Sequence, residues 1–195
     1  MVHYFHPIAF VEQMKLIIIK EDIDLRGKDK WQTQFDVKFG NKTNQDKACW
    51  KACQVVLSNY NVKGGYLIDG NALYQIGIEN NNSLEINIDN AKLAIKYLDK
   101  QLELGKPIIV GVDHTYKYKG GFNNDKSTDH FVVIIGRGSD KKGAFYRFYE
   151  VGTSYESKGT HDDNKLYVKM NNVLKGKPVY TSKHIYTVIQ IRKNN

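Results

Sequence analysis

The most constraining feature of this 195-residue chain is a run of five consecutive apolar residues, Phe131 to Ile135, between His130 and Gly136. A run this short is typical of a strand, and its lack of alternation indicates burial on both faces. Turns rich in Gly, Asn, Asp and Ser separate it from other apolar or aromatic runs. These runs predict further strands at 108–112, 144–151, 166–168 and 185–191. The short connections favour a mainly antiparallel sheet.

The first half of the chain has the spacing of amphipathic helices. Apolar positions three or four residues apart predict helices at 8–20, 46–60 and 89–105. Asp89 can cap the third helix, and Gly105 can end it. Helices first and strands later are typical of an α+β domain. We therefore expect one domain over 1–195, in which helix 46–60 packs on the mainly antiparallel sheet.

Composition indicates a folded, basic chain. The length is sufficient for one hydrophobic core, and 41% hydrophobic residues is too high for a disordered chain. Lys and Arg number 29 against 21 Asp and Glu, which gives a net charge of +8. This charge favours either an ordinary solvated surface or attraction to a polyanion. Because the sequence contains no motif of a nucleic-acid-binding protein, nucleic acid is not predicted as a partner.

The chain shows no signal for a membrane or for general export. No apolar run approaches the ~20 residues that a membrane-spanning helix needs, so no membrane contact is predicted. Residues Met1 to Pro7 have neither the basic start nor the small-residue cleavage site of a secretory signal. We therefore expect a protein that is cytoplasmic when made, which is compatible with export by a specialised secretion system.

Two thiols, Cys49 and Cys53, are the first candidates for chemistry. Cys49 lies in the first turn of the predicted helix 46–60, where the helix dipole favours the thiolate. Cys53 lies one turn further on, among apolar residues, and is expected to fill the core. The spacing of the two thiols also suits a metal site, but no second pair of Cys or His accompanies them, so neither a metal nor another cofactor is predicted.

A thiol nucleophile needs a general base, and six histidines are available. His130 opens the most hydrophobic strand, so it would be held rigidly and could still face a cleft. The alternative for His130 is a hydrogen-bonded histidine at a strand end with no catalytic role. The alternative for Cys49 is an inert buried thiol.

The order of these elements resembles the papain-like cysteine protease superfamily. Gln45 lies a few residues before Cys49-Trp50 at a helix start, as in the nucleophile region of that superfamily, and the strand after Asp129-His130 is similar to its base strand. The resemblance spans roughly residues 44–153. It is strongest for compact bacterial members, similar to bacteriocin-leader peptidases and bacterial effector proteases.

The resemblance implies a papain-like α+β fold and a set of residue roles. Cys49 would be the nucleophile and His130 the base. Gln45 would bind the oxyanion, together with the backbone N–H of Cys49. Glu150, the only carboxylate on the strand after His130, would orient the imidazole where the family uses Asn or Asp. Trp50 would wall the substrate cleft beside the thiol.

The first hypothesis is therefore a cysteine peptidase or amidase. Its substrate would be a peptide, a protein or the peptide stems of bacterial peptidoglycan, and it would suit a toxin-like antibacterial effector with an inhibitor or immunity protein as partner. A second hypothesis is a non-enzymatic basic module that binds a polyanion. A third keeps the same Cys-His chemistry but transfers the acyl group to an amine.

Overall fold

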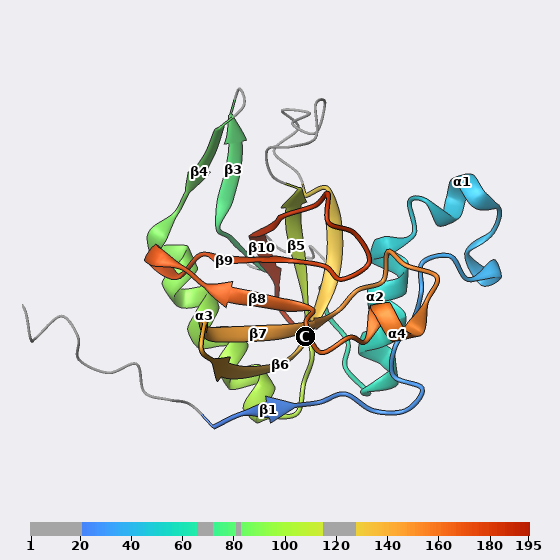
Figure 1. Ribbon diagram of the computed structural model, residues 1–195, viewed down its shortest axis with the longest axis horizontal. Helices are drawn as coiled ribbons and strands as arrows, with labels where there is room; N and C mark the ends of the chain where they lie inside the picture. The colour runs from blue at the N-terminus through green and yellow to red at the C-terminus, as the bar shows by residue number, and fades with distance from the viewer. Residues whose placement is uncertain (1–20, 66–71, 81–82, 115–127) are drawn as a thin grey trace, which may run out of the picture.

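The computed structural model describes residues 21–65, 72–80, 83–114 and 128–195 (Figure 1). Its centre is a closed ring of six strands, each antiparallel to its neighbours. The order around the ring is β6–β5–β10–β9–β8–β7, and β7 pairs again with β6. The strands are β5 (Ile108–His114), β6 (His130–Asp140), β7 (Gly143–Tyr149), β8 (Lys165–Val168), β9 (Leu174–Lys177) and β10 (Tyr186–Arg192).

This ring makes the prediction of an α+β, papain-like fold wrong. The structure is a barrel of antiparallel strands with few helices, rather than a helical half packed on an open sheet. The closing contacts come from β9, which the sequence did not predict because Leu174–Lys177 contains two lysines, a glycine and only one apolar residue. Without β9 the strands have no continuous path around the ring, and an open sheet is the simpler expectation.

Shorter strands extend the sheet. β1 (Ile23–Asp24) pairs with β6, and β2 (Leu73–Gln75) pairs with β10. A separate hairpin follows, made of β3 (Gly77–Asn80) and β4 (Ser83–Ile86). None of these four strands was predicted from the sequence.

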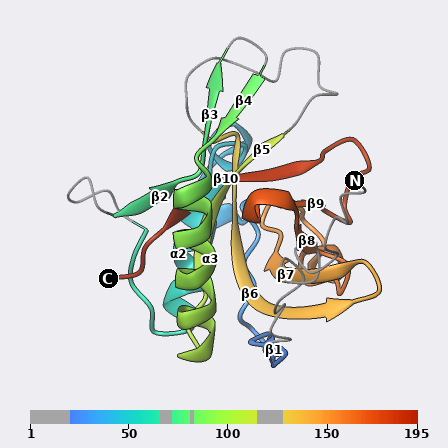
Figure 2. The ribbon, with the colours of Figure 1, turned by 90° about the vertical axis from the view of Figure 1, so that its left-hand side faces the viewer.

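Two long helices cover different sides of the barrel (Figures 1 and 2). They are α2 (Cys49–Asn59) and α3 (Ile88–Glu103). Both confirm the helices predicted at 46–60 and 89–105, although α2 begins three residues later than predicted. Short helices complete the described chain: α1 (Lys42–Gln45), α4 (Glu156–Gly159), η3 (Val37–Phe39) and η4 (Met170–Asn172). The helix predicted at 8–20 lies outside the described residues.

The hydrophobic core has two parts, separated by the barrel wall. In β6, Val132 and Ile134 belong to the cluster that contains α3, whereas Val133 and Ile135 belong to the cluster that contains α2. Alternate residues of one strand therefore face two different cores. This arrangement confirms the prediction that the apolar run is buried on both faces, and it explains why the run does not alternate with polar residues.

Within the described ranges, no helix has both the length and the apolar character needed to cross a bilayer.

Candidate active site

Cys49 is the first residue of α2, and α2 packs against the outer wall of the barrel. The helix N-cap, Ala48, offers no side chain to the free N–H groups of the first turn. The Cys49 sulfur accepts hydrogen bonds from the backbone N–H groups of Trp50 and Phe131. Cys49 is half-buried, whereas Cys53 is fully buried. The two thiols therefore differ in access as the sequence analysis expected.

His130 joins this thiol to a carboxylate. It is the first residue of β6 and is 7% exposed. Its Nε2 lies 2.7 Å from Oε1 of Glu150. The ring also forms a hydrogen bond with the Cys49 side chain. Because Nε2 is engaged by Glu150, Nδ1 is the ring nitrogen that remains for the sulfur.

Glu150 follows the last residue of β7 and is completely buried. Besides His130, its Oε1 accepts a hydrogen bond of 2.6 Å from the backbone N–H of Gly152, and its Oε2 accepts one of 2.8 Å from the hydroxyl of Tyr186. Three donors therefore satisfy this buried carboxylate and fix its orientation. The structure brings Glu150 to the imidazole at hydrogen-bond distance, in the position that the sequence analysis assigned to it.

Gly152 makes room for the glutamate. A Cβ at this position would lie 2.8 Å from Oε1 of Glu150 and 3.2 Å from Nε2 of His130. A side chain at position 152 would therefore crowd the two atoms that form the hydrogen bond between Glu150 and His130. The chain bends at Gly152, and the missing side chain there leaves the space that the longer carboxylate needs.

The electrostatics of the pair favour a thiolate and an imidazolium. Burial opposes ionisation of Cys49, but the hydrogen bond and charge of His130, with the two backbone N–H groups, outweigh it and lower the thiol pKa below its ordinary value. Burial likewise opposes protonation of His130, yet the charge of Glu150 and the bonds to Glu150 and Cys49 raise its pKa to about 10. Both shifts favour a thiolate paired with an imidazolium, which is the ion pair that an activated thiol requires.

Cys53 has the opposite environment. It is fully buried, and that burial, together with the nearby charges of Cys49 and Glu150, raises its thiol pKa well above the ordinary value. A neutral, enclosed thiol of this kind packs as a small apolar residue. Cys53 belongs to the cluster between α2 and the barrel, as the prediction of a core filler required.

Gln45 does not reach the thiol through its amide. It is the last residue of α1, and its Nε2 donates to the carbonyl oxygens of Gly40 at 2.9 Å and Asp36 at 3.4 Å. Both N–H bonds of the amide are therefore used by the preceding loop. The predicted role of Gln45 in binding an oxyanion is corrected on this ground. The backbone N–H of Cys49, at the first position of α2, remains as a candidate donor because the first helical N–H groups have no intrahelical acceptor.

A different glutamine, Gln34, connects the two halves of the site. Its backbone N–H donates to the carbonyl of Val151, just after Glu150, and its Nε2 donates to the carbonyl oxygens of Gln45 and Asp46, just before Cys49. Gln34 is 6% exposed, so these bonds are enclosed. The sequence analysis did not name Gln34, because nothing in its local sequence distinguishes it from the neighbouring polar residues of the loop.

Trp50 lies beside the thiol and is held by its own packing. Its ring meets that of Phe131 edge to face, with centroids 4.9 Å apart, and the guanidinium of Arg192 lies 5.2 Å from the Trp50 ring centre. A Cβ on Gly65 would come within 2.8 Å of the indole. Trp50 therefore forms a rigid wall next to Cys49, and contact with substrate there stays a prediction.

Aromatic and imidazole rings surround the other side of His130. His114, at the end of β5, stacks on His184 at 4.2 Å and on Tyr186 at 5.3 Å between ring centres. Its centre lies 6.0 Å from that of His130. Burial, followed by the nearby charges of His130 and His184, lowers the pKa of His114 to about 3. His114 is therefore neutral wherever His130 is charged near neutral pH.

The sequence analysis missed Tyr186, which donates to Glu150. Tyr186 is the first residue of β10, which is the strand between β5 and β9 in the ring. Only closure of the barrel brings this strand near the end of β7, so the local sequence has no signal for the contact. Over the described ranges, no group of three or more His, Cys, Asp or Glu side chains is arranged to hold a metal ion.

Comparison with known proteins adds no assignment: no protein-family model, no curated protein and no solved structure matches this chain.

Proposed function

We propose that this protein is a cysteine hydrolase that cleaves amide bonds. One observation carries the proposal, namely the continuous series of contacts from the sulfur of Cys49 through the ring of His130 to the carboxylate of Glu150. A nucleophile, a base in contact with it and a third group that orients the base are the parts that covalent acyl transfer needs.

The reaction begins with the thiolate of Cys49, whose proton resides on His130. The sulfur attacks the carbonyl carbon of the scissile amide, and the backbone N–H of Cys49 at the start of α2 can donate to the oxyanion that forms. The imidazolium of His130 then gives its proton to the leaving nitrogen. The C–N bond breaks, an amine departs, and a thioester remains on Cys49.

Water completes the cycle. Neutral His130 removes a proton from a water molecule that attacks the thioester carbonyl. The C–S bond breaks, the acid product leaves, and the proton returns to form the starting ion pair. Throughout, Glu150 holds Nε2 of His130 and stabilises the positive charge of the ring. Tyr186 and Gly152 hold Glu150 in turn.

The substrate class follows from the amide chemistry and the net charge of +8. A peptide or protein and the peptide stem of peptidoglycan both present the required carbonyl. The positive charge favours an anionic substrate such as a bacterial cell wall. Release of new amino groups from purified cell wall, compared with release from casein and peptide libraries, separates the two substrates.

Selective labelling of Cys49 tests the proposal before any substrate is known. We expect iodoacetamide to label Cys49 rapidly and well below pH ~8.5, the ordinary thiol value, whereas Cys53 stays unlabelled in the folded protein. Cys49→Ala should abolish labelling and all amide cleavage, and Cys53→Ala, the matched control, should retain both.

Two results would contradict the proposal. One is labelling of Cys49 with the pH dependence of an ordinary thiol. The other is amide cleavage that persists at full rate in Cys49→Ala. Mass analysis of the products then distinguishes hydrolysis, which yields a free acid, from transfer of the acyl group to an added amine.

A further inference from the structure

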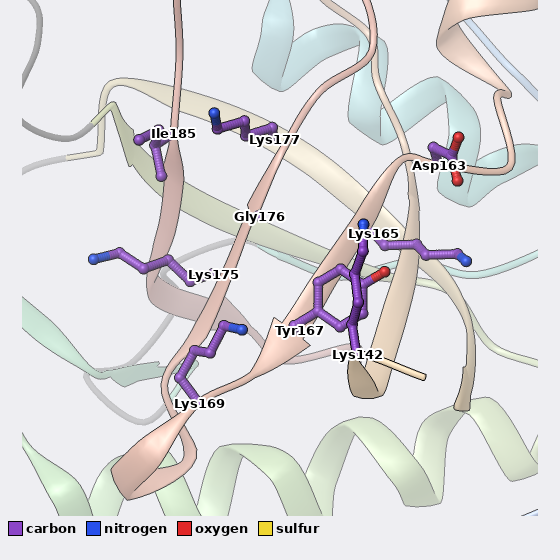
Figure 3. Close-up of a pocket in the computed structure, with 9 residues that line it drawn as sticks. All are labelled: Lys142, Asp163, Lys165, Tyr167, Lys169, Lys175, Gly176, Lys177 and Ile185. Carbon is purple, nitrogen blue, oxygen red and sulfur yellow. The ribbon is translucent and has the colours of Figure 1, made fainter. Parts of the chain in front are cut away.

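A groove of lysines lies on the outside of the barrel, over β8 and β9 (Figure 3). Its volume is about 450 Å³. Five lysines line it together with Tyr167, Gly176, Asp163 and Ile185: Lys142, Lys165, Lys169, Lys175 and Lys177. We call this surface the lysine groove. With five lysines and one aspartate in its lining, the groove is strongly positive.

The strand register places the lysines on one face. Lys165 pairs with Lys177, and Tyr167 pairs with Lys175, while Leu166 between them is buried in the barrel. Side chains at alternate positions of a strand point to the same side. Like charges directly opposite each other in a sheet are destabilising. Lys165 and Lys177 therefore repel each other, and a bound anion would offset the part of that repulsion that Asp140, the ion-pair partner of Lys165, leaves.

Most of this charge has no carboxylate partner. Lys165 forms an ion pair with Asp140 at 2.9 Å, and Tyr167 donates to the same carboxylate at 3.0 Å. In the part of the chain that the structure describes, Lys169, Lys175 and Lys177 form no ion pair. The groove therefore presents at least three ammonium groups that no carboxylate pairs with, spread along its length (Figure 3).

Lysine rather than arginine lines the groove, which indicates the kind of anion. Elsewhere in the described chain, the enclosed carboxylate of Asp99 is held by Arg137, whereas exposed carboxylates pair with either arginine or lysine, as Asp162 does with Arg147 and Asp46 does with Lys42. The planar guanidinium suits two-oxygen contacts with one carboxylate, whereas the ammonium acts as a point charge on a flexible stem and is a common partner of phosphate. A row of point charges suits a chain of repeated phosphates.

The spacing also suits a linear polymer. Lys175 and Lys177 are two residues apart on one strand, so their attachment points are separated by roughly 6.6–6.8 Å. Long, flexible side chains can adjust this separation to successive charges along a chain. Such binding relies on charge density rather than on a fixed geometry.

Tyr167 distinguishes this groove from a surface that stacks nucleic-acid bases. The ammonium groups of Lys169 and Lys142 lie 5.2 Å and 5.9 Å from the centre of its ring. The ring therefore already holds cations over its face, where a base would have to stack. A polymer that carries phosphate charges but no aromatic bases can bind the lysines without stacking on the ring of Tyr167.

We propose that the lysine groove binds a linear polyphosphate-type chain, in which each repeat carries a phosphate charge and no aromatic base. Inorganic polyphosphate and a polyol-phosphate polymer share this chemistry. The binding involves no residue of the Cys49, His130 and Glu150 site, so it is expected to persist unchanged in Cys49→Ala.

Calorimetric titration of the full-length protein tests the proposal. The groove variant combines Lys169→Gln, Lys175→Gln and Lys177→Gln. The matched control combines Lys96→Gln, Lys100→Gln and Lys106→Gln, which removes the same charge from exposed positions on and just after α3. The probes are inorganic polyphosphate, a glycerol-phosphate polymer, single-stranded oligothymidylate and poly-glutamate, and circular dichroism verifies that both variants are folded.

We expect polyphosphate to bind the unmodified protein with an affinity that falls steeply with salt. The slope of log K against log salt concentration should be roughly −3 for four lysine contacts. The groove variant should lose about tenfold or more in affinity, with a slope shallower by about 2. The control should bind as the unmodified protein does. Binding of the glycerol-phosphate polymer at equal or greater affinity assigns the polyol-phosphate source, and weaker binding assigns the inorganic chain.

Three outcomes would overturn the proposal. The first is equal loss of affinity in the groove variant and the control, which would reduce the effect to overall charge. The second is tighter binding of oligothymidylate or poly-glutamate than of either phosphate polymer. The third is no binding of either phosphate polymer at low salt. None of these outcomes depends on amide cleavage, which the labelling of Cys49 tests separately.

Discussion

The role of Glu150 could be predicted from the sequence, but the residues that hydrogen-bond to its carboxylate could not. Cys49, His130 and Glu150 were each named from the sequence, because a thiol at a helix start, a histidine at a strand start and a lone carboxylate on the next strand are local patterns. The residues that hold Glu150 were not named. Tyr186 donates to it from a strand 36 residues away in the sequence, and no local pattern reports a contact at that separation. Gln45 was misassigned for a different reason, since its partners Asp36 and Gly40 lie close in the sequence and take up both N–H groups of its amide.

The charge of Glu150 can be tested without removing its hydrogen bonds. In Glu150→Gln the amide oxygen can still accept from His130 and Gly152, and the amide nitrogen can donate to Tyr186. The variant loses only the negative charge that helps to raise the pKa of His130 to about 10. We expect that pKa to fall and the thiol pKa of Cys49 to rise, so iodoacetamide labelling at pH 6 should slow by about tenfold or more.

The control for this charge is Glu156→Gln, which changes an exposed carboxylate at the start of α4. It should label as the unmodified protein does. If Glu150→Gln kept the original labelling rate at every pH, the carboxylate would have no part in ionising the thiol.

At the scale of elements, the end of β5 faces the start of β10 through a pair of stacked rings. His114 ends β5, and Tyr186 starts β10, with their rings 5.3 Å apart between centres. The sequence predicted both strands but not that their ends meet, because strand pairing between distant segments depends on the whole ring. The half-buried, neutral state of His114 is a consequence of this meeting.

His114 should make the protein sensitive to acid. Its pKa is about 3 in the folded state and about 6.5 in the unfolded chain. Between these values the unfolded chain binds a proton that the folded protein does not, so the free energy of unfolding falls as pH falls, by about 1.4 kcal/mol per pH unit. His130 affects stability at higher pH. Because its pKa is raised to about 10 in the folded protein, its contribution to the free energy of unfolding is fully present below pH ~6.5 and is lost as the pH rises toward about 10.

Urea unfolding of His114→Phe between pH 6.5 and 4.5 measures this contribution. Phenylalanine keeps a ring for the stack and cannot bind a proton, so the fall in stability over this range should be shallower than in the unmodified protein. His161→Asn, at an exposed position, should keep the original slope. Identical slopes for His114→Phe and the unmodified protein would show that the ring is protonated in the folded state.

At the scale of the whole molecule, the barrel is closed most weakly between β9 and β10. Two residue pairs join these strands, whereas seven join β6 and β7. We call this junction of β9 and β10 the seam. It also explains why the overall fold could not be predicted. Individual helices and most ring strands follow from hydrophobic patterns, but closure rests on a short, lysine-rich strand that the patterns do not detect.

Native-state hydrogen exchange should therefore report local opening at this seam. We expect amide protons of β9 to exchange faster than those of β6 under conditions where the molecule stays folded. Equal protection of the two strands would mean that the ring opens only by global unfolding.

Tyr186 belongs both to this seam, where it pairs with Gly176, and to the support of Glu150. Parting β9 from β10 loosens the residue that clamps the carboxylate, while α2 and most of the barrel remain in place. On heating, the enhanced reactivity of the Cys49 thiol should consequently be lost at a lower temperature than the one at which the helices unfold. The protein would then have a folded but inactive form, which arises reversibly when only the β9–β10 pairing is lost.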